Sequence, residues 1–153
     1  MLMRLAIVLV ALPVALILHL QAESAAPLAI VTGLTAITVL MPASAAPALL
    51  IGYAALAMAF AEGHPLRLGV LLMIPLLHLI HITSALAAVV PVKTKIEPAA
   101  LKAPARRFAI VQAISFVVAA FASVIPSGPN IGLVELLGLG SLTVVIAVVA
   151  LRI

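Results

Sequence analysis

Residues 25–61 form an uninterrupted stretch without a single charged side chain. Such a stretch is far longer than the roughly 20 apolar residues that cross a bilayer as one helix. Polar side chains are scarce throughout, because 67% of the 153 residues are hydrophobic and 8% are charged, with a mean hydropathy of +1.45. Too few polar side chains remain to cover the core of a soluble domain. The sequence therefore predicts a protein whose solvent is lipid.

Turn-forming residues divide the apolar sequence into six predicted spans. Two prolines within residues 41–47 break the long uncharged stretch into a hairpin of two short helices. The six spans are residues 5–20, 26–41, 46–61, 68–90, 108–125 and 131–151. We predict helices because a span in lipid must satisfy its own backbone groups, and no alternating pattern indicates a barrel. The predicted fold class is all-α: a polytopic transmembrane bundle, with residues 1–153 as a single integral-membrane domain.

Positive charge is concentrated between the fourth and fifth predicted spans. Segment 91–107 contains three prolines, which argue against a continuous helix, so we predict a loop. Its cations are Lys93, Lys95, Lys102, Arg106 and Arg107. With Glu97 they sum to +4, the net charge of the whole chain, because three arginines and three glutamates cancel elsewhere. By the positive-inside rule this loop faces the cytoplasm, and six spans then place both termini there.

Other topologies stay open at this point. If residues 25–61 only dip into the membrane, four spans keep Arg4 in the cytoplasm, whereas five spans move it outside. Arg67 is the one cation that six spans place on the outer side. The first span also has features of a signal peptide, but its apolar run exceeds the usual length of about 7 to 15 residues, so we expect a retained helix.

Several function classes are excluded by what the sequence lacks. The absence of cysteine excludes disulfides, thiolate metal sites and cysteine nucleophiles. The cations lie between apolar runs and are not interleaved with aromatic residues, so we expect no nucleic-acid partner. The sequence contains no glycine-rich phosphate loop, no Ser-His-Asp arrangement and no H-E-x-x-H motif. We therefore expect that the protein is not an enzyme.

His78, His81 and Glu135 are the candidates for an intramembrane polar site. The two histidines are three residues apart, which places them on neighbouring positions of one helix face, and Pro75 leaves a backbone carbonyl nearby without its usual partner. Haem or metal ligation, a proton relay and interhelical packing are the alternatives. Two histidines on one face cannot ligate one haem from opposite sides, so we expect no cofactor and no metal. Glu135 is either an interfacial acid at a helix start or a carboxylate facing the bundle.

Small side chains recur at helical spacing in the fifth predicted span. Ser115, Ala119 and Ser123 lie four residues apart, and Ala109 and Ala113 repeat the same interval. Such small-xxx-small patterns allow the backbones of two helices to approach closely. We therefore predict tight helix contacts here, with a partner in the same chain or in another.

These observations predict a small multi-pass protein of the bacterial inner membrane, since the bias toward Ala, Val, Leu, Pro and Gly is typical of GC-rich bacterial genomes. We expect an accessory or assembly subunit of a larger membrane complex, with the lipid bilayer and a membrane protein or a second copy as partners. The basic loop also suits anionic lipid headgroups. The alternative is a small transporter or channel whose polar path is lined by His78, His81 and Glu135.

Overall fold

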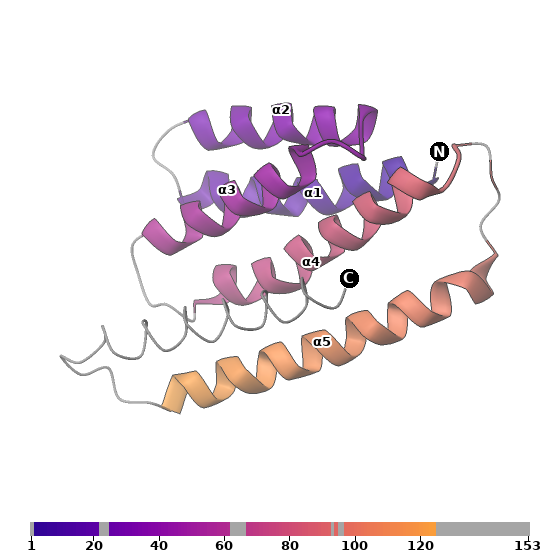
Figure 1. Ribbon diagram of the computed structural model, residues 1–153. Helices are drawn as coiled ribbons and strands as arrows, with labels where there is room; N and C mark the ends of the chain where they lie inside the picture. The colour runs from indigo at the N-terminus through magenta and orange to yellow at the C-terminus, as the bar shows by residue number, and fades with distance from the viewer. Residues whose placement is uncertain (1, 22–24, 62–66, 93, 95–96, 125–153) are drawn as a thin grey trace. The chain divides into compact units, whose positions relative to one another are not determined.

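The computed structural model describes residues 2–21, 25–61, 67–92, 94 and 97–124, which fold into helices without a strand (Figure 1). The helices are α1 (Leu2–Gln21), α2 (Ala26–Leu40), α3 (Ala46–Phe60), α4 (Leu68–Val89) and α5 (Pro98–Val124). The chain divides into two compact units, Met1–Ala119 and Ala120–Ile153. The first unit contains nearly all of the residues described, and the predicted span 131–151 lies outside them. The all-helical prediction is confirmed for the described part of the chain.

Three of these helices are long and apolar enough to cross a membrane: α1, α4 and residues Pro98–Phe121 of α5. Helices α2 and α3 are apolar but have 15 residues each. At 1.5 Å per residue each is about 22 Å long, shorter than a hydrocarbon layer of about 30 Å. The predicted hairpin of short helices therefore forms, and full crossing of a bilayer by either helix requires local thinning of the hydrocarbon layer.

Proline sets most of the helix boundaries. Pro27 and Pro47 occupy the first turns of α2 and α3, where the missing N–H has no intrahelical partner in any case. The hydroxyl of Ser44 accepts a 3.2 Å hydrogen bond from the amide of Ala46, which satisfies a backbone donor at the start of α3. At the end of α4, Val90 is extended because it precedes Pro91.

The prediction that residues 91–107 form a loop is wrong for the second half of this segment. Helix α5 begins at Pro98, ten residues before the predicted start at residue 108, so Lys102, Arg106 and Arg107 lie on a helix. Pro98 is tolerated as the first helical residue, and the alanine-rich sequence after it has high helix propensity. Only Pro104 interrupts the helical hydrogen bonds, and α5 continues through it. Lys93 and Lys95 lie outside the described residues.

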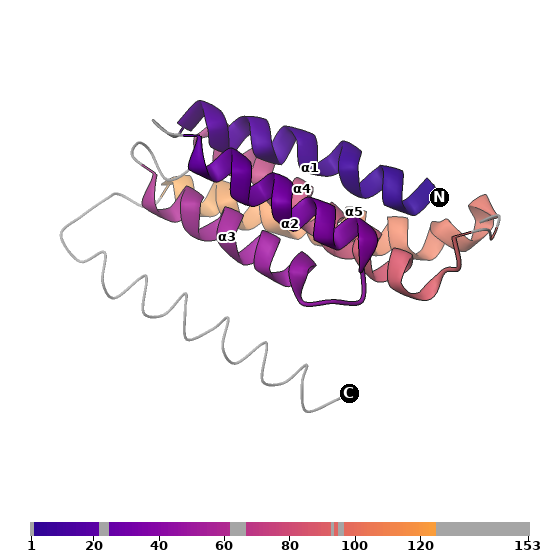
Figure 2. The same ribbon diagram turned by 90° about the horizontal axis from the view of Figure 1, so that it is seen from above.

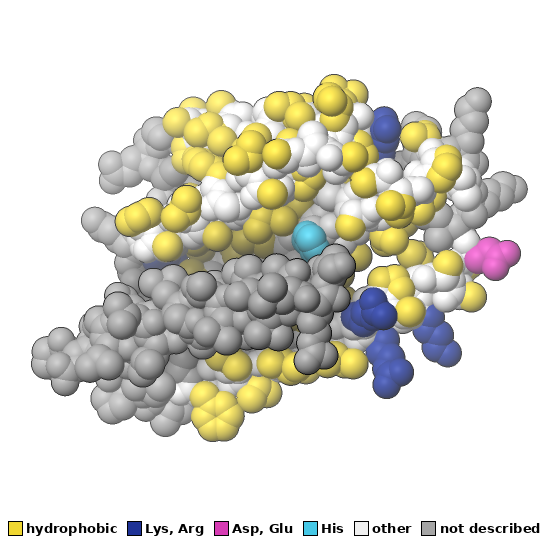
Figure 3. All heavy atoms as spheres, viewed as in Figure 1, with side chains coloured by type: hydrophobic (Ala, Val, Ile, Leu, Met, Phe, Trp, Pro, Cys, Tyr) yellow, Lys and Arg dark blue, Asp and Glu magenta, His cyan; other side chains and the backbone are white. Residues whose placement is uncertain are grey.

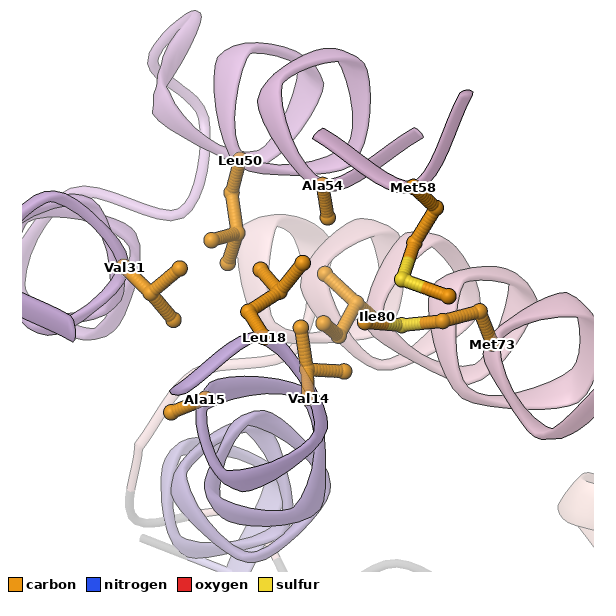
Figure 4. Packing of buried hydrophobic residues seen from close by; sticks show 9 residues of the cluster. All are labelled: Val14, Ala15, Leu18, Val31, Leu50, Ala54, Met58, Met73 and Ile80. Carbon is orange, nitrogen blue, oxygen red and sulfur yellow. The ribbon is translucent and has the colours of Figure 1, made fainter. Parts of the chain in front are cut away.

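Helices α1 to α4 pack around one apolar core. Helix α1 contacts both α2 and α4, and α3 contacts α2 and α4, as the two views of the ribbon show (Figures 1 and 2). Val14 and Leu18 of α1 point toward Leu50 of α3 and Ile80 of α4 (Figure 4). Met58 and Met73 close the core beside Ile80. Since lipid is as apolar as these side chains, close packing rather than exclusion from water holds the helices together.

The outer surface of the helices is also apolar. Leu9, Leu12 and Leu16 of α1 are each more than half exposed, and α5 exposes Ile114, Val118 and Phe121 in the same way. A continuous apolar surface of this kind would drive a soluble protein to aggregate, but in a bilayer it faces acyl chains. The arrangement of apolar residues inside and outside the bundle is that of a membrane protein.

Alternating helix directions give the bundle two distinct ends. At the Arg4 end, the start of α1 lies beside the α2–α3 turn and the end of α4, because Arg4, Met41 and Val90 line one cavity. At the Arg67 end, the end of α1 lies beside the end of α3 and the start of α4, where Gly69 is close to Gln21 and Met58.

Gly69 provides a test of the packing at the Arg67 end. A Cβ at this position would meet the side-chain amide of Gln21 and lie 3.5 Å from side-chain atoms of Ile17 and Met58. We expect Gly69→Leu to lower the free energy of unfolding by about 1–3 kcal/mol, as overpacking of a closed site does. Gly69→Ala should cost less, because the end of the flexible Gln21 side chain can move.

The matched controls are Gly33→Leu and Gly52→Leu, because a Cβ at either glycine meets no atom within 4 Å. Unfolding by sodium dodecyl sulfate in mixed micelles measures all four variants. A loss of stability in the controls as large as that in Gly69→Leu would contradict the packing described.

Candidate functional site

The polar centre of the described bundle is a contact between α4 and α5. The side-chain Nε2 of Gln112 lies 2.7 Å from Nδ1 of His78, and the two residues are 34 positions apart in the chain. The ring of Phe108 lies against the imidazole, with a centroid distance of 5.1 Å and planes tilted by 43°. With the Gln112 amide donating, Nδ1 of His78 accepts and the ring proton resides on Nε2.

Gln112 is unusually buried for a residue of α5. Only 7% of its surface is exposed, and its side-chain Oε1 has no hydrogen-bond partner among the described residues. An amide that lies in apolar surroundings with one unsatisfied oxygen is unfavourable, so the bond to His78 compensates only part of the cost. This pair is therefore a specific polar contact that joins α5 to α4.

His81 does not join this pair. It lies on the exposed surface of α4, whereas His78 is half-buried. The two imidazoles occupy neighbouring positions on one side of α4, and it is His78 that lies within hydrogen-bond distance of Gln112. Among the described residues there is no group of three or more His, Cys, Asp or Glu side chains that could hold a metal ion. Glu135, the third predicted member of a polar site, lies outside the described residues.

Two small residues of α5, Ser115 and Ala119, lie on the same helix face as the buried Gln112. Ser115 and Ala119 are half-buried and follow Gln112 at intervals of three and seven residues, which continues one helix face. Ser123 is part of the helical backbone of α5. The two predicted series of small residues therefore lie on different faces of α5, because Ala109 and Ala113 are exposed.

Hydroxyl groups within the bundle are mostly satisfied by their own helices. Thr38, which is fully buried, donates to the carbonyl of Leu34 at 2.8 Å, and Ser84 donates to Ile80 at 2.6 Å. Thr83 bonds the carbonyl of Leu79 at 2.6 Å. Bonds from a hydroxyl to the carbonyl four residues earlier are the usual structural use of Ser and Thr in apolar helices. These hydroxyls are satisfied within their own helices, whereas the Oγ1 of Thr35 is buried without a partner among the described residues.

Arg67, the cation that the charge pattern leaves unexplained, binds the end of a neighbouring helix. Its guanidinium donates to the carbonyl of Ala61 at 3.0 Å and to that of Met58 at 3.3 Å. The last carbonyls of α3 have no intrahelical donor and carry the negative end of the helix dipole. A cation at this place stabilises the helix terminus, so local structure accounts for Arg67 without reference to topology.

The basic residues of α5 lie at the opposite end of the helix from its apolar part. Lys102, Arg106 and Arg107 are exposed near the start of α5, where the Lys and Arg side chains on this face gather (Figure 3). All three lie beyond the first turn of α5, where the helix dipole has little effect on a charge. Their long side chains are suited to reach lipid headgroups.

The residues that the structure describes form an all-helical fold in which three helices are long and apolar enough to cross a membrane. Comparison of the chain with protein-family models, curated proteins and solved structures found no match.

A double-mutant cycle tests whether the His78–Gln112 pair attaches α5. We expect His78→Leu and Gln112→Leu each to destabilise the protein, with a coupling of about 0.6 kcal/mol and at most about 1.7, the range of interhelical hydrogen bonds in membranes. The free energy of unfolding in mixed micelles gives the coupling. The matched control is the cycle between His81→Leu and Gln112→Leu, which should show no coupling because His81 is exposed. Equal couplings in the two cycles would refute the assignment.

Proposed function

We propose that this chain is an accessory or assembly subunit of a larger membrane complex and that α5 is the helix that contacts the partner. The observation that carries the proposal is the small burial of α5. In its most apolar part 6% of the residues are buried, against 28% in α1 and 22% in α4. A long helix that is little buried by the described part of the chain is suited to pack against a helix of another protein.

The exposed side of α5 has features that favour a protein over lipid as its neighbour. Ala109 and Ala113 are exposed and lie one turn apart, so a second helix can approach the backbone there. Phe116, also exposed, lies on the same side at the next position of a helix-packing seam. The connections that the structure describes are short, so contacts with a partner fall mainly on the helices.

The alternative is a transporter or channel with a path lined by His78, His81 and Glu135. In the described part of the chain, His78 is bonded to Gln112 and His81 lies on the exposed surface. No observation on those residues favours a continuous polar path. The accessory role is therefore the better supported of the two.

Six spans with both termini in the cytoplasm remain the proposed topology, in the bacterial inner membrane that the composition favours. The two ends of the bundle support part of this arrangement. Arg4 and residue Thr94, which follows α4, both line a small cavity at the Arg4 end. The charge excess of segment 91–107 and the positive-inside rule then place this end in the cytoplasm. Arg67 at the other end has its local structural role.

Cysteine labelling tests the topology directly, because the native chain has no cysteine. With Ser44→Cys, Thr94→Cys and Gln21→Cys, we expect the first two to be labelled from the cytoplasmic side and the third from the outer side. Ser127→Cys should be labelled from the outer side and Arg152→Cys from the cytoplasmic side if six spans form. Labelling of Thr94→Cys and Gln21→Cys from the same side would exclude the bundle as a spanning unit, and outer labelling of Arg152→Cys would exclude six spans.

Affinity purification in a mild detergent tests the accessory role. We expect a membrane protein to co-purify in stoichiometric amount with the wild-type chain and to be lost from Ala109→Leu with Ala113→Leu, since two added side chains block a close helix approach. The matched control is Ala55→Leu with Ala59→Leu, the same spacing on the exposed surface of α3. A chain that purifies alone and conducts ions or solutes in liposomes would instead support the transporter.

A further inference from the structure

A cavity of about 540 Å³ opens at the Arg4 end of the bundle. Its walls come from three elements that are far apart in the chain: the first turn of α1, the turn between α2 and α3, and the end of α4. Residues 41–44 form one wall and residues 87–92 another, and Arg4 is the one charged residue among the described residues that line it. The described lining is therefore mostly apolar, with Arg4 as its charged residue and Ser44 as a polar one.

Arg4 has no partner for its charge in the described part of the chain. Its Nε is buried and forms no hydrogen bond, and no carboxylate lines the cavity. Arg4 is half-buried, and leaving its buried Nε–H without an acceptor is unfavourable, a cost that an anion in the cavity would remove. Arg4 lies on the first turn of α1, and the first N–H groups of a helix also lack intrahelical acceptors. Leu2 and Met3 of this turn line a smaller cavity that adjoins Arg4.

The chemistry of the walls selects the kind of anion. A free phosphate ion carries polar oxygens on every side, whereas this cavity offers Met41, Pro42 and Val89 as apolar surfaces. A phospholipid has both parts, because its phosphate matches the planar guanidinium and its glycerol and upper acyl chains match the apolar wall. The cavity also lies at the end of helices of membrane length, which is where headgroups are found.

We propose that the cavity at the Arg4 end binds the phosphate of an anionic phospholipid, with Arg4 as the residue that recognises it. The site is independent of the accessory role of α5, since it uses only α1, the α2–α3 turn and the end of α4. It adds a specific lipid site to the general attraction of the basic residues on α5 for an anionic surface.

Native mass spectrometry of the purified full-length chain, delipidated in detergent and titrated with phosphatidylglycerol or phosphatidylcholine, tests the proposal. We expect the wild type to bind one phosphatidylglycerol in preference to phosphatidylcholine. Arg4→Gln should weaken the binding of phosphatidylglycerol about tenfold, as loss of a charge-assisted hydrogen bond does. Arg4→Lys should retain part of the affinity, because a point charge replaces the planar fork.

Two controls separate the cavity from general electrostatics. Lys102→Gln removes the same charge from an exposed position on α5 and should change the affinity less than twofold, about the limit of a screened surface charge. Ala88→Phe keeps Arg4 but fills the cavity, and it should block binding as Arg4→Gln does. If Arg4→Gln fails to fold, Ala88→Phe and Arg4→Lys still provide the comparison.

Three results would overturn the proposal. Equal affinity of the wild type for the two lipids would show that the cavity does not select an anion. An equal loss in Lys102→Gln and Arg4→Gln would assign the effect to surface charge. Displacement of phosphatidylglycerol by excess inorganic phosphate would identify a site for free phosphate rather than for a lipid.

Discussion

The need to satisfy every polar group without water governs this structure. In an apolar environment an unpaired donor or acceptor is costly, so the backbone forms helices and the hydroxyls of Thr38 and Ser84 bond the carbonyls of their own helices. The same requirement accounts for Arg67, whose guanidinium takes up two carbonyls at the end of α3. Groups that this rule leaves unsatisfied, such as the Nε of Arg4 and the Oε1 of Gln112, mark the places where something else is expected to bind or pack.

The helices differ in how firmly they are integrated. Helices α1 to α4 share a closed core around Leu18, Leu50 and Ile80, which specifies their arrangement through packing. Helix α5 instead meets α4 through the pair of His78 and Gln112 and the ring of Phe108. A polar contact in an apolar environment specifies register even where little surface is buried. Such a helix combines a fixed position in its own chain with a surface that is open to a partner, as an assembly subunit requires.

The sequence predicted the helical hairpin of α2 and α3 because two prolines within residues 41–47 interrupt a stretch that is too long for one span. It failed at segment 98–107, where charges and prolines suggested a loop. Pro98 begins a helix instead of ending one, and the alanines around Lys102 favour helix strongly enough to include Pro104. Local patterns therefore predict where a helix is interrupted better than they predict how far it extends beyond the apolar region.

The sequence by itself determined that the chain is helical, that its surroundings are apolar, and which residues carry charge. Those properties follow from composition and from spacing within a few residues. Only the tertiary structure decided that His78, and not His81, bonds to Gln112, because Gln112 lies on another helix, 34 residues further along the chain. It also brought Arg4 beside the α2–α3 turn and the end of α4 to form a cavity. Contacts between distant segments depend on how the helices pack against one another. The pattern of apolar residues within one helix does not encode this packing.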